Sequence, residues 1–275
     1  MITGAKARLI AREDKQVHHL DYDHTFTSTP TIATVKTDAA VANELGLSIF
    51  HWDVSQAFVQ GESEEDMICL RLPKVAERLQ ASGRVVNLSR STNGLEKASI
   101  IWHTLPANIL KEKGFQQRLT DPCLFHRIFD RRVEIIIVLH VDDMKVIGSK
   151  EVCDRLYEDL NQHSPQNNLG ELKWCKGCAI DQNSETGTTK ISGTAFIDTV
   201  CQRISVTSTS LIPPIPTTVL RSREDEEEQC SWPCREAIGS LMWLANIIRS
   251  DISNAVREVA RHNNNPGPEH WKAVV

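Results

Sequence analysis

The spacing of apolar residues predicts alternating helices and short strands. Between Thr31 and Leu47 the apolar positions recur at helical spacing and stop near Gly46, which predicts a helix. The residues that follow, SIFHWDV, are typical of a strand. A second helix is expected from Glu96 to Phe115, and Pro106 should kink it or end its first part.

The stretch EIIIVLHVDDMKVIG, from Glu134 to Gly148, contains two short apolar runs separated by two aspartates. Each run has the length of a strand, so the stretch predicts a pair of strands. The next segment, Ser149–Gln162, predicts a helix, because a serine can cap its first turn and its apolar residues fall four apart.

Beyond residue 170 the pattern changes twice. ELKWCKGCAID predicts one strand and TTKIS a second, joined by a turn that contains Gly187. Residues 208–218, STSLIPPIPTT, have the composition of a linker, and helical patterns follow over Arg235–Ile248 and Asp251–His262. The proline-rich linker is therefore the predicted domain boundary.

Composition and charge narrow the class of protein. The 275 residues are 40% hydrophobic and 24% charged, as in an ordinary globular chain. No apolar run is longer than a strand, so we expect neither membrane insertion nor secretion, but a cytoplasmic or nuclear setting. The net charge of −5 is not typical of a nucleic-acid-binding domain, although Lys6, Arg8 and Arg12 form a cationic opening segment.

Eight cysteines raise the alternative of a zinc-stabilised interaction module. Cys175 and Cys178 stand as C-x2-C, and Cys230 and Cys234 as C-x3-C. The two pairs are much farther apart than the pairs of a zinc ribbon, and the first pair lies in a predicted strand. We therefore expect reduced thiols and no structural metal.

The adjacent carboxylates Asp142 and Asp143 are candidates for chemistry. Successive side chains of a strand point to opposite faces, so both can act together only if the backbone turns there, as at a hairpin tip. A structural role is the alternative, because aspartate is common in turns. Asp53 is a third carboxylate at a predicted strand end. Carboxylates from two strand ends can hold Mg²⁺, and two such ions about 3.5–4 Å apart serve polymerases and some nucleases.

Blocks of the sequence resemble, in order, those of reverse transcriptases from copia-type long-terminal-repeat retrotransposons. KARLIAR resembles K-A-R-L-V-A-R, and DVSQAFVQGESEEDMICLRLP resembles D-V-x-x-A-F-L-x-G-x-L-x-E-E-I-Y-M-x-x-P. GLEKASIIW is similar to G-L-K-Q-A-S-R-x-W, GFQQRLTDPCLF to G-F-x-x-S-x-x-D-P-C-L-F, and HVDDMKVIG to Y-V-D-D-M-L-I-x-G. LGELKWCKGCAID, REAIGSLMWLANIIRSDISNAV and NPGPEHWKAV follow the family's downstream order. Order and spacing together carry the resemblance.

The resemblance implies an α+β right-hand polymerase with an antiparallel palm sheet. It implies fingers and palm over residues 1–162, and the remaining palm with a hairpin and a helix over 163–210. A proline-rich linker and a helical thumb-like or connection-like segment would occupy 211–275, ending before a ribonuclease H domain. The implied activity is RNA- and DNA-templated DNA synthesis, in a cytoplasmic virus-like particle or the nucleus. Implied partners are an RNA or DNA template–primer, deoxynucleoside triphosphates and other Pol polyprotein segments, with no membrane.

The resemblance also implies residue roles. Asp53, Asp142 and Asp143 would be catalytic and would ligate two Mg²⁺ ions, for which Mn²⁺ is a substitute. Phe58 matches the aromatic residue beside the sugar, where its ring would leave no room for a ribose hydroxyl. A core position is the alternative for Phe58.

Further residues would contact the nucleotide or its surroundings. Lys6 and Arg8 match fingers cations that meet the triphosphate, and a solvated surface is their alternative. Asn93 and Gly94 fall where the family has Tyr-Gly, in a loop facing the incoming nucleotide and template. Trp102 is interpreted as a core aromatic on a helix.

Several positions depart from the family pattern: Glu13 for glycine, Glu96 for lysine, Ile100 for arginine, His140 for tyrosine, Cys234 for tyrosine and Ser250 for proline. Glu96 places a negative charge beside a polyanionic substrate, where like charge is unfavourable. These departures favour an alternative function class, a catalytically decayed retrotransposon relic with at most residual nucleic-acid binding.

Overall fold

The computed structural model describes residues 9–61, 68–72, 85–183, 185–206, 220–224 and 226–275. The chain forms two compact units, one of residues 1–172 with 182–188, and one of residues 173–181 with 189–275. The proline-rich segment that we predicted as the domain boundary lies outside the described residues, as do Lys6 and Arg8.

The first unit is built on a six-stranded sheet in the order β4-β5-β6-β7-β1-β8, and its neighbouring strands are antiparallel. The strands are β1 (Ser48–Val54), β4 (Gln116–Gln117), β5 (Leu124–Phe129), β6 (Arg132–His140), β7 (Asp143–Gly148) and β8 (Gln166–Glu171). The predicted strand SIFHWDV and the predicted strand pair after Glu134 are confirmed. A separate pair is β2 (Cys69–Arg71) with β3 (Val85–Asn87).

The described α-helices of this unit are α1 (Ile32–Glu44), α3 (Ala98–Glu112) and α4 (Lys150–Asn161). Two short 3-10 helices are η1 (Glu13–Lys15) and η2 (Ala57–Val59). The Thr31 and Ser149 hydroxyls accept backbone N–H groups at the starts of α1 and α4, as expected of N-caps. Pro106 was expected to kink this helix or to end its first part; the second alternative is wrong, because α3 continues through Pro106.

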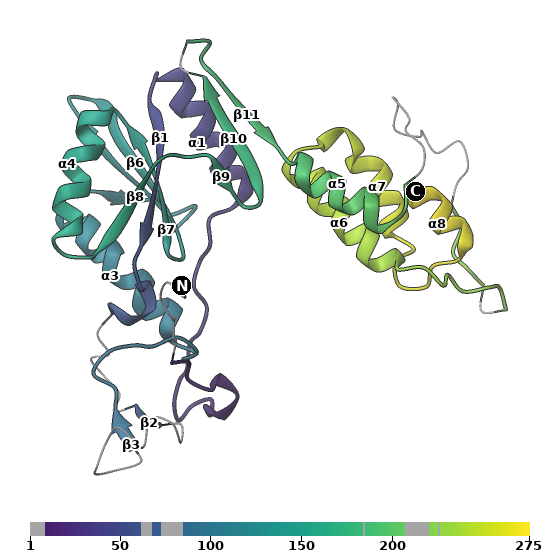
Figure 1. The fold of residues 1–275 in the computed structure, drawn as a ribbon, viewed down its shortest axis with the longest axis horizontal. Coiled ribbons are helices and arrows are strands. Elements are labelled where there is room, and N and C mark those ends of the chain that lie inside the picture. The colour runs from purple at the N-terminus through teal and green to yellow at the C-terminus, as the bar shows by residue number, and fades with distance from the viewer. Residues whose placement is uncertain (1–8, 62–67, 73–84, 184, 207–219, 225) are drawn as a thin grey trace, which may run out of the picture. The chain divides into compact units, whose positions relative to one another are not determined.

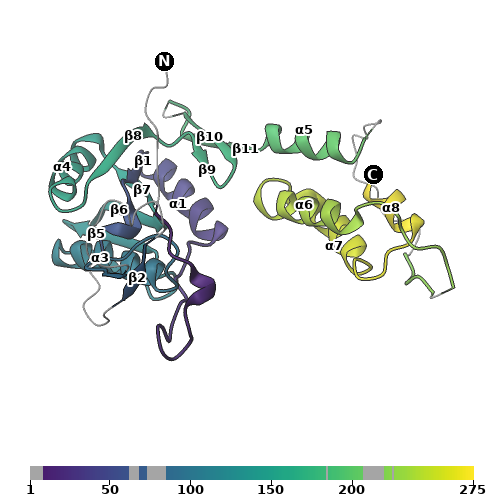
Figure 2. The same cartoon turned by 60° about the horizontal axis from the view of Figure 1, so that its bottom comes forward.

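The alternation of side chains gives the sheet two different faces. On one face Trp52, Met144 and Val146 pack in a hydrophobic core with residues of α3 and α4. On the other face lie Ile49, His51 and Asp53 of β1, and α1 covers part of it (Figures 1 and 2). The sequence of β1 therefore separates a core face from a face that carries a carboxylate at its end.

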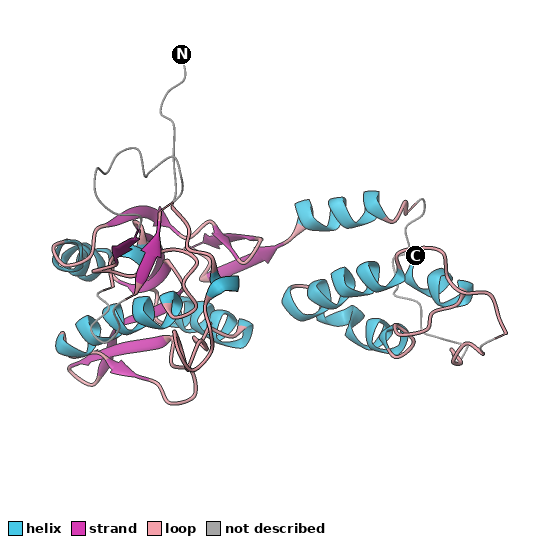
Figure 3. Ribbon diagram, turned by 90° about the horizontal axis from the view of Figure 1, so that it is seen from below, coloured by secondary structure: helices cyan, strands magenta, loops and turns pink. Residues whose placement is uncertain are grey.

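The second unit combines a small sheet with helices (Figure 3). Strands β9 (Trp174–Cys175), β10 (Cys178–Asn183) and β11 (Thr188–Ser192) form a sheet in the order β11-β10-β9. The helices are α5 (Thr194–Arg203), α6 (Cys234–Ile247), η3 (Ser250–Ile252), α7 (Ser253–Ala260) and α8 (Pro268–Val274). Both predicted helical patterns are confirmed, and α8 was not predicted. Among the described helices, none has the length and apolar character needed to cross a membrane.

The prediction of a single strand over ELKWCKGCAID is wrong. The segment folds back between β9 and β10 at Lys176 and Gly177, whose φ angles are 48° and 80°. Two positive φ angles in a two-residue connection are the pattern of a type I′ hairpin turn. Cys175 and Cys178 consequently lie opposite each other across the turn.

Candidate active site

The two adjacent aspartates lie at a hairpin tip, as predicted. Val141 and Asp142 connect β6 to β7, and Asp143 is the first residue of β7, opposite His140. Val141 has a φ of 56°, whereas Asp142 is not among the residues with positive φ. Positive φ at the first central residue alone is the pattern of a type II′ turn, whose first central position is usually glycine. A β-branched residue in this conformation is strained.

Strand register brings the third carboxylate to the same place. Asp53 lies directly opposite Asp143 on the neighbouring strand, and Asn167 of β8 lies opposite Asp53 on its other side. Directly opposite residues of antiparallel strands have their Cβ atoms about 4.5–5.5 Å apart. Two carboxylates therefore share one end of the sheet face, beside the turn that carries Asp142. Like charges placed this way repel each other unless a cation lies between them.

Two histidines contact the Asp143 carboxylate. The imidazoles of His140 and His51 hold the pKa of Asp143 below its usual range, against the opposing effect of burial. His51 is the closer, with Nε2 2.8 Å from Oδ1, whereas His140 Nδ1 is 4.0 Å from Oδ2, so His51 makes the hydrogen bond. His51 was not predicted as a site residue, although its position two residues before Asp53 places it on the same face.

The chemistry of these donors fits a divalent cation. Carboxylate oxygens are the ligands that Mg²⁺ prefers, and Asp142 is exposed while Asp53 and Asp143 are half-buried. Among the described residues, no three histidine, cysteine or acidic side chains lie close enough together to hold an ion. The Asp143 carboxylate is hydrogen-bonded to His51, and an ion shared with Asp53 would compete with that bond.

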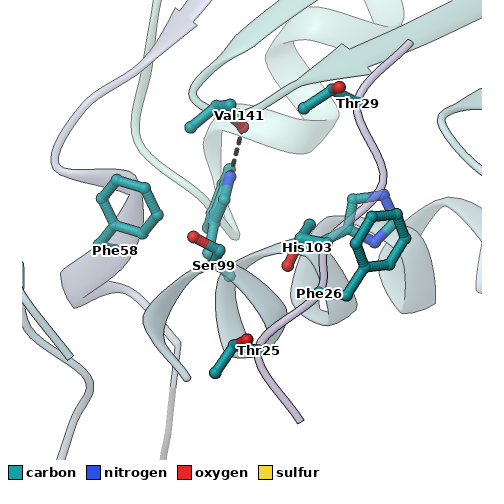
Figure 4. Close-up of a pocket in the computed structure, with 9 residues that line it drawn as sticks. Thr25, Phe26, Thr29, Phe58, Ser99, His103 and Val141 are labelled. Atoms are coloured by element: carbon teal, nitrogen blue, oxygen red, sulfur yellow. Dashed lines mark hydrogen bonds between the residues drawn. The ribbon is translucent and has the colours of Figure 1, made fainter. Parts of the chain in front are cut away.

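A cavity of about 410 Å³ adjoins the turn (Figure 4). Its walls are Phe58 of η2, Val141, residues between Thr25 and Thr29, and Ser99, Trp102 and His103 of α3. Phe58 is half-buried and also packs against the core residues. The structure thus places Phe58 beside the hairpin tip, in a position that suits both its predicted role at the sugar and the core alternative.

Asn93 and Gly94 lie in a loop before α3, where the N-terminal segment crosses them. The carbonyl of Asn93 accepts a hydrogen bond of 2.8 Å from the Ala11 backbone N–H. Gly94 has a φ of 82°, and a Cβ there would overlap the carbonyl oxygen of Ala11. The glycine is therefore required by backbone conformation and close approach. Two residues later, Glu96 donates its backbone N–H to Gln16 Oε1 at 2.8 Å.

Two charged residues are buried where α1 covers the sheet face that carries His51 and Asp53. Asp38 of α1 is 7% exposed, and Lys145 of β7, opposite His51, is 5% exposed. Within the described part of the chain, neither Asp38 Oδ2 nor Lys145 Nζ has a hydrogen-bond partner. Burial, with a smaller contribution from the Asp121 carboxylate, raises the pKa of Asp38 to about 6, and Lys145 opposes the shift.

The sequence of the chain matches a known protein family. The family described as "Reverse transcriptase (RNA-dependent DNA polymerase)" matches residues 3–217. The chain is 29% identical to the "Retrovirus-related Pol polyprotein from transposon TNT 1-94" of Nicotiana tabacum, over 98% of this chain and 21% of that protein. It is 26% identical to the polyprotein "from transposon RE1" of Arabidopsis thaliana, over 98% of this chain and 18% of that protein.

The chain thus spans about a fifth of the length of these relatives. The family match covers the sheet, its hairpin tip and the loop before α3, all of which lie between residues 3 and 217. This chain therefore belongs to the reverse transcriptase family of copia-type retrotransposon Pol polyproteins, as the order of its sequence blocks predicted.

Proposed function

We propose that this chain extends a DNA primer on an RNA or DNA template, using deoxynucleoside triphosphates. One observation supports this above the others. Asp53 and Asp143 lie directly opposite each other on one sheet face, and Asp142 lies in the adjoining two-residue turn. Because the chain belongs to the reverse transcriptase family, we assign these three aspartates to the family's reaction, DNA synthesis on a template.

The proposed fold is a right hand. The six-stranded sheet of the first unit would be the palm, and residues around the loop before α3 would belong to the fingers. The helices of the second unit would form a thumb-like or connection-like part. The antiparallel sheet with a carboxylate-bearing hairpin supports the palm assignment.

Asp53, Asp142 and Asp143 would hold two Mg²⁺ ions, with Mn²⁺ as a substitute. When bound, such ions lower the pKa of an attacking hydroxyl and offset the charge of the leaving oxygen. The primer 3′ hydroxyl loses its proton to solvent, its oxygen forms a bond to the α-phosphorus, and the bond from that phosphorus to the bridging oxygen of the β-phosphate breaks, releasing pyrophosphate. Phe58 would stand against C2′ of the incoming sugar, because it lines the cavity beside the turn.

Primer extension tests the proposal directly. Purified chain should extend a labelled DNA primer on an RNA template when Mg²⁺ or Mn²⁺ is added, and EDTA should stop the reaction. Template and triphosphate are omitted in turn as controls. No extension by folded protein with either metal would contradict the proposal.

A catalytically decayed relic is the second candidate. The hydrogen bond between His51 and Asp143 favours it, because a carboxylate that is already hydrogen-bonded to an imidazole is less available to a cation. The acidic side chain of Glu96, in the loop that would face the substrate, favours it too. The experiment is to restore the family residues with E96K and H140Y. If the parent does not extend a primer and the double variant does, the departures from the family pattern abolished the activity.

A further inference from the structure

The carbonyl oxygens of both residues in the Val141–Asp142 turn accept hydrogen bonds from outside the hairpin. The backbone N–H of Val54, directly after Asp53, donates to the Asp142 oxygen at 2.8 Å. The indole Nε1–H of Trp102 donates to the Val141 oxygen at 2.5 Å, the dashed bond in Figure 4. The turn that carries Asp142 is therefore held from β1 on one side and from α3 on the other.

The Val141 oxygen belongs to the peptide unit between the two central residues of the turn. Types I′ and II′ have positive φ at the first central residue, and they differ in whether the second also has it. Turning over the central peptide interconverts the two types. Because the bond from Trp102 fixes the direction of this carbonyl, it selects the type II′ arrangement and with it the backbone angle of Asp142.

Val141 itself contributes little to holding this conformation. Its side chain is 42% exposed, so packing does not offset the strain of a β-branched residue at positive φ. Such strain costs about 1–3 kcal/mol and persists only where surrounding contacts determine the conformation. Trp102 is only 2% exposed and belongs to the same hydrophobic core as Leu139 and Met144, the residues flanking the hairpin tip.

We infer that Trp102 is a positioning residue for the catalytic hairpin, acting through the hydrogen bond from its indole N–H to the Val141 carbonyl. The expected effect of this hydrogen bond on catalysis rests on the proposed polymerase function, whereas its expected effect on the turn does not. The hydrogen bond gives Trp102 a role beyond that of a core aromatic, because a phenyl ring could pack in the core but has no N–H group to donate.

The chain offers a matched control. Trp52 belongs to the same core and is 1% exposed, and its buried Nε1 has no hydrogen-bond partner among the residues that the structure describes. W102F and W52F therefore remove similar volumes from one core, and only W102F removes a hydrogen bond to the turn. A core Trp→Phe change that acts only through packing should affect both variants alike.

Two readouts test the inference. Primer extension over a range of triphosphate concentrations should show kcat falling by at least about tenfold in W102F, since small misplacements of catalytic groups are costly. KM should change by less than about twofold, because ground-state binding is retained. Hydrogen exchange over residues 139–146 should be faster in W102F than in W52F at equal free energy of unfolding.

The outcomes separate the two proposals. Equal losses of kcat in W102F and W52F, or equal exchange of the hairpin in both, would overturn the role of Trp102. A parent that extends nothing refutes the polymerase proposal, and hairpin exchange still decides the role of Trp102. If W102F does not fold, W102M is compared with W52M, because methionine fills irregular core gaps without an N–H donor.

Discussion

Asp53 and Asp143 are ninety positions apart in the chain and occupy opposite positions on neighbouring strands. The sequence shows each as a carboxylate at a strand end, but only the register places them on one face. A shift of one residue would turn one of them to the core face. The pairing of the strands, rather than either residue alone, therefore creates the candidate site.

Replacing Asp142 by asparagine should abolish extension without unfolding the chain. Asparagine keeps the size of the side chain and removes the charge that attracts a cation, so extension should fall by at least about 100-fold. Asp142 is exposed, and stability without metal should stay within about 0.5 kcal/mol of the parent. Extension rates and urea unfolding measure the two effects.

The same variant distinguishes metal binding from a structural turn. A ligand that binds the folded state stabilises it, so Mg²⁺ should raise the melting temperature of the parent more than that of D142N. D154N, a change at a carboxylate on α4, is the control and should respond as the parent does. Equal extension by parent and D142N would refute the assignment of Asp142.

Phe58 should determine the choice of sugar. F58V opens space where the ring would exclude a 2′-hydroxyl, so the preference for deoxyribonucleotides should fall by about tenfold, because the discrimination is steric. Competition between ribo- and deoxyribonucleoside triphosphates measures it. F115V, a core change outside the cavity, should keep the parental preference. Unchanged discrimination in F58V would identify Phe58 as core packing only.

At the scale of elements, the helices with caps were predictable and the polar strands were not. α1 and α4 begin after a threonine and a serine whose hydroxyls cap them, and their apolar spacing is visible in the sequence. β8, with the sequence QNNLGE, has no apolar alternation, and it forms because β1 offers a free edge. The turn at Lys176 and Gly177 was missed because the residues on both of its sides are strand-like.

The site was predictable to the same extent. The three aspartates and Phe58 stand out in the sequence because each comes after an apolar run or lies within a block that resembles the family. The contacts of His51 with Asp143 and of Trp102 with Val141 depend on side-chain directions that no local pattern contains. A polar residue two positions before Asp53 was the available signal for His51.

α1 should make stability depend on pH through Asp38. Its pKa of about 6 lies above the usual value, so the folded state favours the protonated form. The contribution of Asp38 to stability is therefore full below about pH 4 and is lost as pH rises towards 6, at a cost of up to about 3 kcal/mol. The difference in free energy of unfolding between D38N and the parent should increase by this amount from pH 4 to pH 7.

Urea unfolding at several pH values measures the effect. E44Q alters an exposed carboxylate of the same helix and should show no such pH-dependent difference. A constant difference between D38N and the parent over this range would mean that Asp38 is charged in the folded state throughout. The buried Lys145 would then be the ionic partner of the Asp38 carboxylate in the folded state at every pH in this range.

At the scale of the whole molecule, the second unit contains the cysteines that raised the zinc alternative. Residues 173–181 and 189–275 include both cysteine pairs. Cys175 and Cys178 flank a tight turn, so the argument that they lie in a plain strand no longer holds. The Sγ atoms of Cys230 and Cys234 are 2.9 Å apart, and burial, together with the Cys230 thiol, raises the pKa of Cys234 to about 12.

We still expect no structural zinc. The thiolate is the form that binds metal, and a raised pKa keeps Cys234 protonated. Protein purified without added metal should therefore contain less than one equivalent of zinc, and EDTA should leave its melting temperature unchanged in the absence of Mg²⁺. Metal analysis and thermal unfolding measure this, and stoichiometric zinc with unfolding by chelator would establish the zinc-stabilised alternative.

The strand order has a consequence for biosynthesis. β1 is the first strand of the six-stranded sheet to be made, yet its place is between β7 and β8. At roughly 5–20 residues per second, the ribosome makes about 90 more residues, over about 5–20 s, before β7 begins. During that interval both edges of β1 lack their partner strands, and its apolar side lacks the residues of α4 that cover it in the folded unit. A nascent chain halted before Asp143 is therefore the form in which association with chaperones should be greatest.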